Sequence, residues 1–195
     1  DIIRFIIDKG EKRDGYMPTF FHGDHASTFI SGSWLRGLHD FDLERAYKLI
    51  LKNATVPGKG GRRYLDEYME RGWIAEKDTV NIPTWDEYKG AVTKTQEYAY
   101  DDYAVALVAK ELGDEANYKL MMERSNNYKT LFDPSTGFWR GKIDDGSWIQ
   151  DFDPFYIDCE GQRIQEVKTR IAGKELVRFH VLLVEDNEIN MEIAE

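Results

Sequence analysis

The chain has 195 residues, of which 42% are hydrophobic and 32% are charged, so one sizeable folded domain is expected rather than a disordered chain. The formal net charge of −10 argues against nucleic-acid binding, because no basic excess is present to release counterions from a phosphate backbone. No apolar run reaches the roughly 18 residues of a membrane span, and Cys159 is the only cysteine, which excludes an intrachain disulfide and a cysteine-rich zinc site.

The first ten residues, DIIRFIIDKG, combine an acidic start with a short apolar stretch. They lack the basic region and the small-residue cleavage site of a signal peptide. We therefore interpret them as the end of a helix from a longer sequence, and localisation stays unknown.

Two helices are predicted next, over residues 23–38 and 41–54, and the second of them is amphipathic. Asp24 and Asp42 are the expected N-caps. The first helix should bury the apolar residues that recur at helical spacing, which are Ala26, Phe29, Ile30, Trp34 and Leu38. The second should bury Leu43, Ala46, Tyr47, Ile50 and Ala54.

A short helix over residues 62–72 should end at Gly72, and a longer one follows a polar loop. Thr93 and Gln96 fit a capping box at the start of this longer helix, which runs to Leu112.

Residues 114–132 predict another helix, with Asp114 as its N-cap. The turn signals DPSTG and DDG flank FWRGKI and predict a short β-hairpin.

The helix ending at Leu112 is apolar nearly all round, which is typical of an interior helix, yet it carries Glu97, Asp101 and Asp102. Buried carboxylates need water, a cation, hydrogen-bond donors or a ligand. First-turn acids also favour the helix dipole, so Glu97 fits a capping role equally well. A polar cavity at the N-terminal end of the helix accounts for all three acids.

A second dense motif is FFHGDHAS, which contains His22, Asp24 and His25. Imidazole and carboxylate suit divalent metals, but this spacing matches no strong zinc signature. The alternatives are an N-cap beside structural histidines, or side chains that hydrogen-bond a polar ligand.

Both motifs lie where an apolar helix begins. If inner and outer helices alternate, the inner helices are parallel and their N-termini open on the same side. Aromatic rings would then join the acids and histidines in an environment suited to a sugar; these rings are Phe20, Phe21 and Tyr98.

Consecutive blocks of the chain resemble glycoside hydrolase family 92, a family of exo-acting α-mannosidases. The blocks include FFHGDHASTFISGSWLRG, FDLERAYKLILKNATVPG, VTKTQEYAYDDYAVALVAKELGD and FDPSTGFWRGKIDDGSWIQDFDP, and the similarity covers about residues 1–156. The resemblance implies a mainly α fold, in which helical hairpins form part of an (α/α)6 toroid. It also implies inverting hydrolysis, often of α-1,2 linkages, and calcium dependence with ligands expected outside this chain. Full-length members are often secreted or periplasmic.

The resemblance stops before the catalytic pair. The family's acid is a glutamate in a motif like E-x-N-x-W-Q beyond the FDP block, and its base is an aspartate in a Gly-Asn-x-Asp segment. This chain continues IDCEGQRIQ and contains no Gly-Asn dipeptide. We therefore expect no catalytic residue and no metal ligand here, and a substrate-binding role for His22, Asp24, His25, Glu97, Asp101 and Asp102.

The last segment, HVLLVEDNEINMEIAE, resembles the start of a response-regulator receiver domain, at about residues 178–195. Residues 157–177 form a junction of unclear character.

The leading hypothesis is therefore a fragment of an α-mannosidase that binds mannose-containing glycans, is inactive alone, and self-associates through uncovered helix faces. A non-catalytic carbohydrate-binding domain and a signalling protein are the alternatives.

Overall fold

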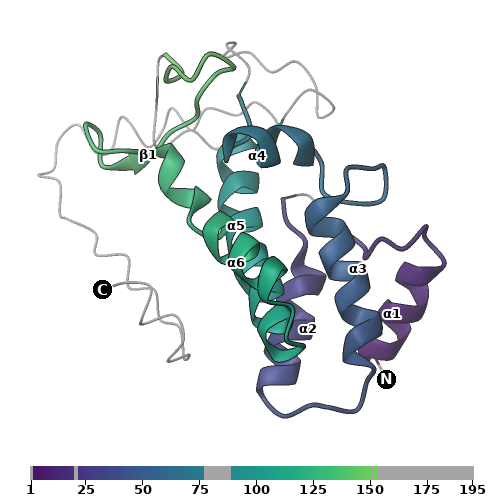
Figure 1. Cartoon of the computed structure of the whole chain (residues 1–195). Coiled ribbons are helices and arrows are strands. Elements are labelled where there is room, and N and C mark those ends of the chain that lie inside the picture. Colours follow the sequence, from purple (N-terminus) through teal and green to yellow (C-terminus); the bar gives the residue numbers. More distant parts are fainter. Residues whose placement is uncertain (1, 20–21, 77–88, 151, 153–195) are drawn as a thin grey trace, which may run out of the picture. The chain divides into compact units, whose positions relative to one another are not determined.

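The computed structural model describes residues 2–19, 22–76, 89–150 and 152, and every structural statement below concerns these residues (Figure 1). The helices are α1 (Ile2–Glu11), α2 (His25–Leu35), α3 (Leu43–Thr55), α4 (Leu65–Arg71), α5 (Ala91–Glu111), α6 (Glu115–Arg124) and the 3₁₀ helix η1 (Asn127–Leu131). Strands β1 (Phe132–Asp133) and β2 (Phe138–Trp139) pair antiparallel. The predicted mainly α fold with a short β-hairpin is confirmed. The junction and the receiver-like tail lie outside the described residues.

Helix α5 is the central element, as its nearly all-round apolar sequence predicts. It packs against α2, α3, α6 and η1 (Figure 1). Its residues Val105 and Ala109 share a core with Ile30 of α2, Ile50 of α3 and Met121 of α6. Because other helices pack on several sides of α5, polar groups on its buried sides, such as Asp101 and Asp102, meet protein rather than water.

Three of the predicted helix ends are confirmed. Asp42 and Asp114 accept hydrogen bonds from the backbone N–H of Arg45 (3.0 Å) and of Asn117 (3.1 Å). Gly72 closes α4 with φ of 80°, a left-handed conformation that glycine adopts without a Cβ clash.

The predicted start of α5 is wrong. The helix begins at Ala91 instead of after Thr93, because Gly90 turns the chain with φ of 57° and supplies no side-chain cap. The Thr93–Gln96 capping box is therefore not formed.

Helix α6 is shorter than predicted and ends at Arg124. The side chains of Ser125 and Asn126 both donate to the carbonyl of Met122, at 2.7 and 3.0 Å. Such local bonds compete with the helical ladder, and the chain continues as η1 after Asn126.

The predicted buried stripe of α2 is also wrong in part. Ile30 is fully buried, but Phe29 and Leu38 are 44% and 60% exposed. The helix instead buries Ser27, Ser31 and Ser33, and Ser27 Oγ donates to the buried carboxylate of Asp24. Periodicity of apolar residues alone therefore misplaced this face.

Large apolar side chains also lie exposed on α1, where Ile2 and Phe5 are 68% and 64% accessible. They are the kind of surface on which the self-association hypothesis rests, and that hypothesis stays a prediction. No helix among the described residues is both long and apolar enough to cross a membrane.

Candidate functional site

Asp24 immediately precedes α2, as predicted, but its carboxylate does not cap the helix. It is fully buried, and it accepts hydrogen bonds from Asn53 Nδ2 (2.9 Å), Ser27 Oγ (2.9 Å) and Arg62 Nε (3.3 Å). The Asn53 amide in turn bonds both backbone groups of Met17, at 3.0 and 3.2 Å. Asp24 thus ties the start of α2 to α3 and to the loop that carries Arg62.

Arg62 is the centre of a buried ion network. Its side chain is fully buried and reaches Asp102 through Nη1 at 2.5 Å as well as Asp24. The guanidinium lies over the ring of Tyr98, 5.1 Å from its centroid. Burial alone would lower the pKa of Arg62, but the carboxylates of Asp102 and Asp24 more than offset this, so its pKa is raised and it stays charged.

Asp102 extends this network to α4 and α6. Its carboxylate accepts from Tyr68 OH at 3.1 Å and pairs with Arg124 Nε at 2.9 Å. Arg124 Nη1 also donates to the carbonyl of Ala54 at the end of α3 (2.8 Å). A single buried carboxylate therefore links α5 to three neighbouring segments.

Asp101 lies beside Asp102 near the middle of α5 and is equally buried. One of its oxygens, Oδ2, accepts the backbone N–H of Asp24 at 2.6 Å. The other, Oδ1, has no hydrogen-bond partner among the described atoms. Burial raises the pKa of Asp101 well above its ordinary value, and Arg62 only partly opposes this.

The remaining predicted residues are nearer the solvent. The side chains of His25 and Glu97 are 54% and 36% exposed, and His25 Nδ1 lies 3.8 Å from Glu97 Oε2. His22 is partly buried, which lowers the pKa of its imidazole, and the charge of Lys94 lowers it further. Lys94 is itself buried on α5, which lowers its pKa to about 8.

The six predicted site residues are therefore brought together, but in two layers. Asp24, Asp101 and Asp102 form a buried layer, and His22, His25 and Glu97 are more accessible. The predicted convergence with Phe20 and Phe21 lies outside the described residues, while Tyr98 is buried and donates its hydroxyl hydrogen to the carbonyl of Arg63 (3.0 Å). The substrate-binding role of the six residues stays a prediction.

Sequence reasoning missed Arg62 and Arg124. The acids of α5 did signal that some cation, donor, water or ligand must meet them. Nothing in the residue spacing indicated which of the chain's basic residues would be buried beside them.

No group of three or more His, Cys, Asp or Glu side chains among the described residues is arranged to hold a metal ion. The buried carboxylates are instead occupied by Arg62, Arg124, Asn53 and Tyr68. The described residues thus offer no calcium site, and the expectation that the calcium ligands lie outside this chain stays a prediction.

Loss of the Tyr68 hydroxyl tests the network without removing a charge. Tyr68→Phe is expected to lower the free energy of unfolding by about 1–2 kcal/mol, because Asp102 loses a buried donor. Urea unfolding measures the change, and Tyr64→Phe at the start of α4 is the matched control, with less than half that effect. Equal losses in the two variants would contradict a role for the Tyr68–Asp102 bond.

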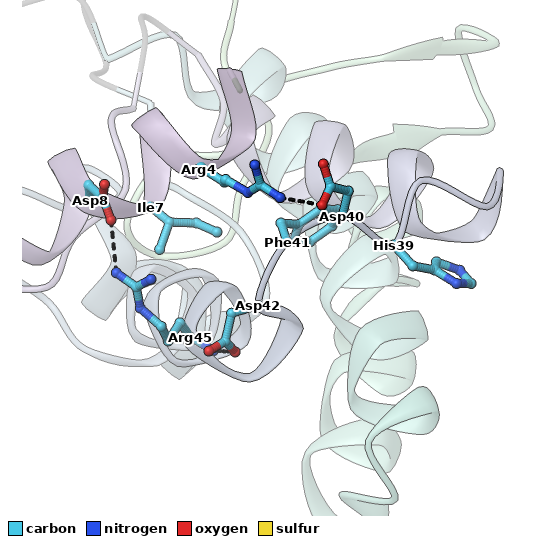
Figure 2. A pocket seen from close by; sticks show the side chains of 8 residues that line it. All are labelled: Arg4, Ile7, Asp8, His39, Asp40, Phe41, Asp42 and Arg45. Carbon is cyan, nitrogen blue, oxygen red and sulfur yellow. Dashed lines mark hydrogen bonds and ion pairs between the residues drawn. The ribbon is translucent and has the colours of Figure 1, made fainter.

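A second group of charged residues lines a groove of about 430 Å³ between α1, α3 and the loop before α3 (Figure 2). Its acids are already engaged: Asp8 pairs with Arg45 at 2.8 Å, and Asp40 pairs with Arg4 (Figure 2). Asp42 caps α3. These exposed pairs connect α1 to α3 and to the loop before it. We therefore interpret the groove as a packing contact and not as a ligand-binding site.

Comparisons with known protein families and with solved structures point to the same family. The model of the glycosyl hydrolase family 92 catalytic domain matches residues 6–172. This match extends beyond the boundary predicted near residue 156, and the predicted domain boundaries themselves stay predictions.

A curated relative is an uncharacterized secreted glycosidase of Arthroderma benhamiae, 29% identical over 145 residues. This alignment covers 70% of the present chain and 18% of the relative. Among solved structures, the family GH92 α-mannosidase BT3965 of Bacteroides thetaiotaomicron in complex with mannoimidazole is 30% identical, with a TM-score of 0.70. That comparison covers 83% of the present chain and 21% of the mannosidase.

The family GH92 inverting mannosidase BT2199 of the same bacterium is 24% identical with a TM-score of 0.67, and it supports the fold alone. The chain spans about a fifth of the length of these relatives.

Proposed function

Because the chain belongs to glycosyl hydrolase family 92, we propose that it is part of an α-mannosidase and contributes to binding a mannose-containing glycan. The family match over residues 6–172 is the main support for this proposal. The similarity to a bacterial α-mannosidase at 30% identity supports mannose as the sugar that is bound. The finer expectations are exo-cleavage, an α-1,2 preference, inversion and calcium dependence. They come from the family resemblance and belong to the same proposal.

The side chains proposed to contact the sugar are His22, His25 and Glu97. Imidazole and carboxylate groups can both donate to or accept from hydroxyls, depending on their protonation. The spacing of 3.8 Å between His25 and Glu97 leaves both able to turn toward a ligand. Asp24 and Asp102 act behind them, because their oxygens are already bonded within the protein.

Hydrolysis with inversion needs one carboxylic acid to protonate the leaving oxygen and one carboxylate to activate water. Asp24 and Asp102 are held by arginines and are closed to solvent, so they suit neither task. We infer that this chain binds without turnover. Calcium would polarise the substrate or orient its hydroxyls, but the described residues supply no site for it.

Binding of mannoimidazole, the inhibitor present in the BT3965 complex, tests this proposal. His25→Ala and Glu97→Ala are each expected to weaken binding about tenfold, or about 1.4 kcal/mol, since each removes one polar contact. Isothermal titration calorimetry measures the affinity. His39→Ala is the control, because His39 is an exposed histidine beyond the opposite end of α2.

Hydrolysis of an α-mannoside by the same protein, with and without a calcium chelator, completes the test. We expect no turnover in either condition. No binding by the wild type would refute the sugar-binding proposal, and turnover would refute the inference that the catalytic pair is missing.

A further inference from the structure

The buried ion network contains one more acid than base. Its carboxyl groups belong to Asp24, Asp101 and Asp102, and its guanidinium groups belong to Arg62 and Arg124. If all five were charged, the network would hold an uncompensated negative charge inside the protein. Such a charge is normally removed by binding a proton.

Hydrogen-bond donors decide which carboxyl group binds that proton. Asp24 accepts from a guanidinium, an amide and a hydroxyl. Asp102 accepts from two guanidinium groups and a tyrosine. Asp101 accepts one backbone N–H, and its second oxygen has no partner among the described atoms. Burial raises the pKa of Asp24 as well, but its Arg62, Asn53 and Ser27 donors oppose this rise. Because donors favour the charged form and Asp101 has the fewest, Asp101 is the acid expected to stay neutral.

The charges facing Asp101 agree with this assignment. Burial is the main reason why the pKa of Asp101 is raised, Arg62 opposes the rise, and the carboxylates of Asp24 and Asp102 add to it. Further titratable groups of the neighbouring elements are Tyr98 of α5, Tyr68 of α4 and Arg124 of α6. Burial raises the pKa of both tyrosines, so neither contributes a negative charge at neutral pH.

Asp101 also controls the backbone between the two histidines. Its Oδ2 holds the N–H of Asp24, which stands between Gly23 and His25 in the chain. A Cβ placed on Gly23 would lie 2.5 Å from Cε1 of His25, so the imidazole packs directly on this backbone. A shift of the segment at Asp24 would therefore move the His25 ring.

We propose that Asp101, as the uncharged acid, is a positioning residue that holds the segment 22–25 in place for sugar binding. The role of Asp101 in sugar binding rests on the proposed function. The uncharged state of Asp101 does not depend on it. When Asp101 loses its proton, its carboxylate repels that of Asp24 and the segment loosens.

Asp101→Asn separates the uncharged from the charged state, because the amide keeps an oxygen for the Asp24 N–H and cannot ionise. The folded state raises the pKa of Asp101, so its stabilising effect is complete below the unfolded value near 3.8 and is lost as pH rises through the folded value. Over that window the unfolding constant of the wild type should increase about tenfold per pH unit relative to the variant.

The experiment follows the Asp24 backbone amide by NMR and mannoimidazole binding by calorimetry, both across pH, in wild type and Asp101→Asn. We expect the Asp24 amide to titrate with Asp101 in the wild type and to lose that step in the variant. Binding by the variant should stay within about threefold of the wild type at pH 6 and should exceed it at alkaline pH. Titration of Lys94 and of His22 affects both proteins alike.

An unchanged Asp24 titration in the variant would overturn the assignment of the proton. A tenfold loss of binding in the variant at pH 6 would show that the carboxylate itself is needed, and would overturn the inference while the proposed function stands. If the wild type fails to bind mannoimidazole at any pH, the proposed function and the positioning role fail together, and the NMR titration still decides the charge state.

Discussion

Arg62→Met should strongly destabilise the protein, lowering the free energy of unfolding by about 3–5 kcal/mol. The methionine fills much of the same volume but leaves Asp24 and Asp102 without their shared cation. Asp24 then lies buried without its guanidinium partner, and Asp102 keeps only Arg124 of its two arginines. A loss of this size is a large fraction of the stability of an ordinary domain.

The neighbouring residue supplies a matched control. Arg63 is exposed, so Arg63→Met makes the same chemical change one position along and should alter stability by less than about 0.5 kcal/mol. Urea unfolding at neutral pH measures both variants. A small loss in Arg62→Met would mean that Arg62 does not neutralise the acids of α2 and α5. The deficit should also shrink at low pH, because burial raises the pKa of Asp24 and its protonated carboxyl group no longer needs a cation.

Asp102→Ala is the second substitution with a large expected effect. It removes the shared partner of Arg62 and Arg124 and the acceptor of Tyr68, and should also lower the free energy of unfolding by about 3–5 kcal/mol. The sequence predicts a substrate-binding role for Asp102, which would make the same substitution weaken sugar binding. Because Asp102 is fully buried, the structure predicts that any loss of binding follows from loss of folding.

Asp102 either contacts the ligand or stabilises the fold, and the two interpretations predict different effects of Asp102→Ala on binding and on unfolding. Thermal unfolding and mannoimidazole binding are measured on the same sample, with Asp66→Ala, an exposed acid of α4, as the control. Weaker binding with unchanged unfolding would show that Asp102 contacts the ligand, contrary to the buried network. We expect the Asp102→Ala variant to lose folded protein. Lowering the temperature should restore both the folded state and mannoimidazole binding.

The helix ends were predictable because they depend on neighbours in the chain. Asp42 and Asp114 bond to a backbone N–H three residues away, and Gly72 needs only its own backbone freedom. The predicted start of α5 was wrong because Gly90 turns the chain, and the helix begins, before the apparent capping box. Local signals therefore predict ends well where one interaction dominates, and poorly where two starts compete.

The interior position of α5 was also predictable, since an apolar sequence on all sides can be stabilised only by other protein. The buried side of α2 was not. It includes Ser27, whose hydroxyl donates to the buried Asp24, and a count of apolar residues cannot include the effect of such a bond.

The sequence alone established the family, the mainly helical fold, and the presence of acids that required compensation inside α5. Folding was needed to choose Arg62 and Arg124 as their partners. The ion pairs join residues 38, 40 and 22 positions apart, so no helical or strand period records them. The choice depends on which cation reaches the α5 carboxylates when the helices pack, and that is a property of the assembled core. For this reason Asp24, Asp101 and Asp102, grouped with the histidines by sequence, belong to a buried layer behind them.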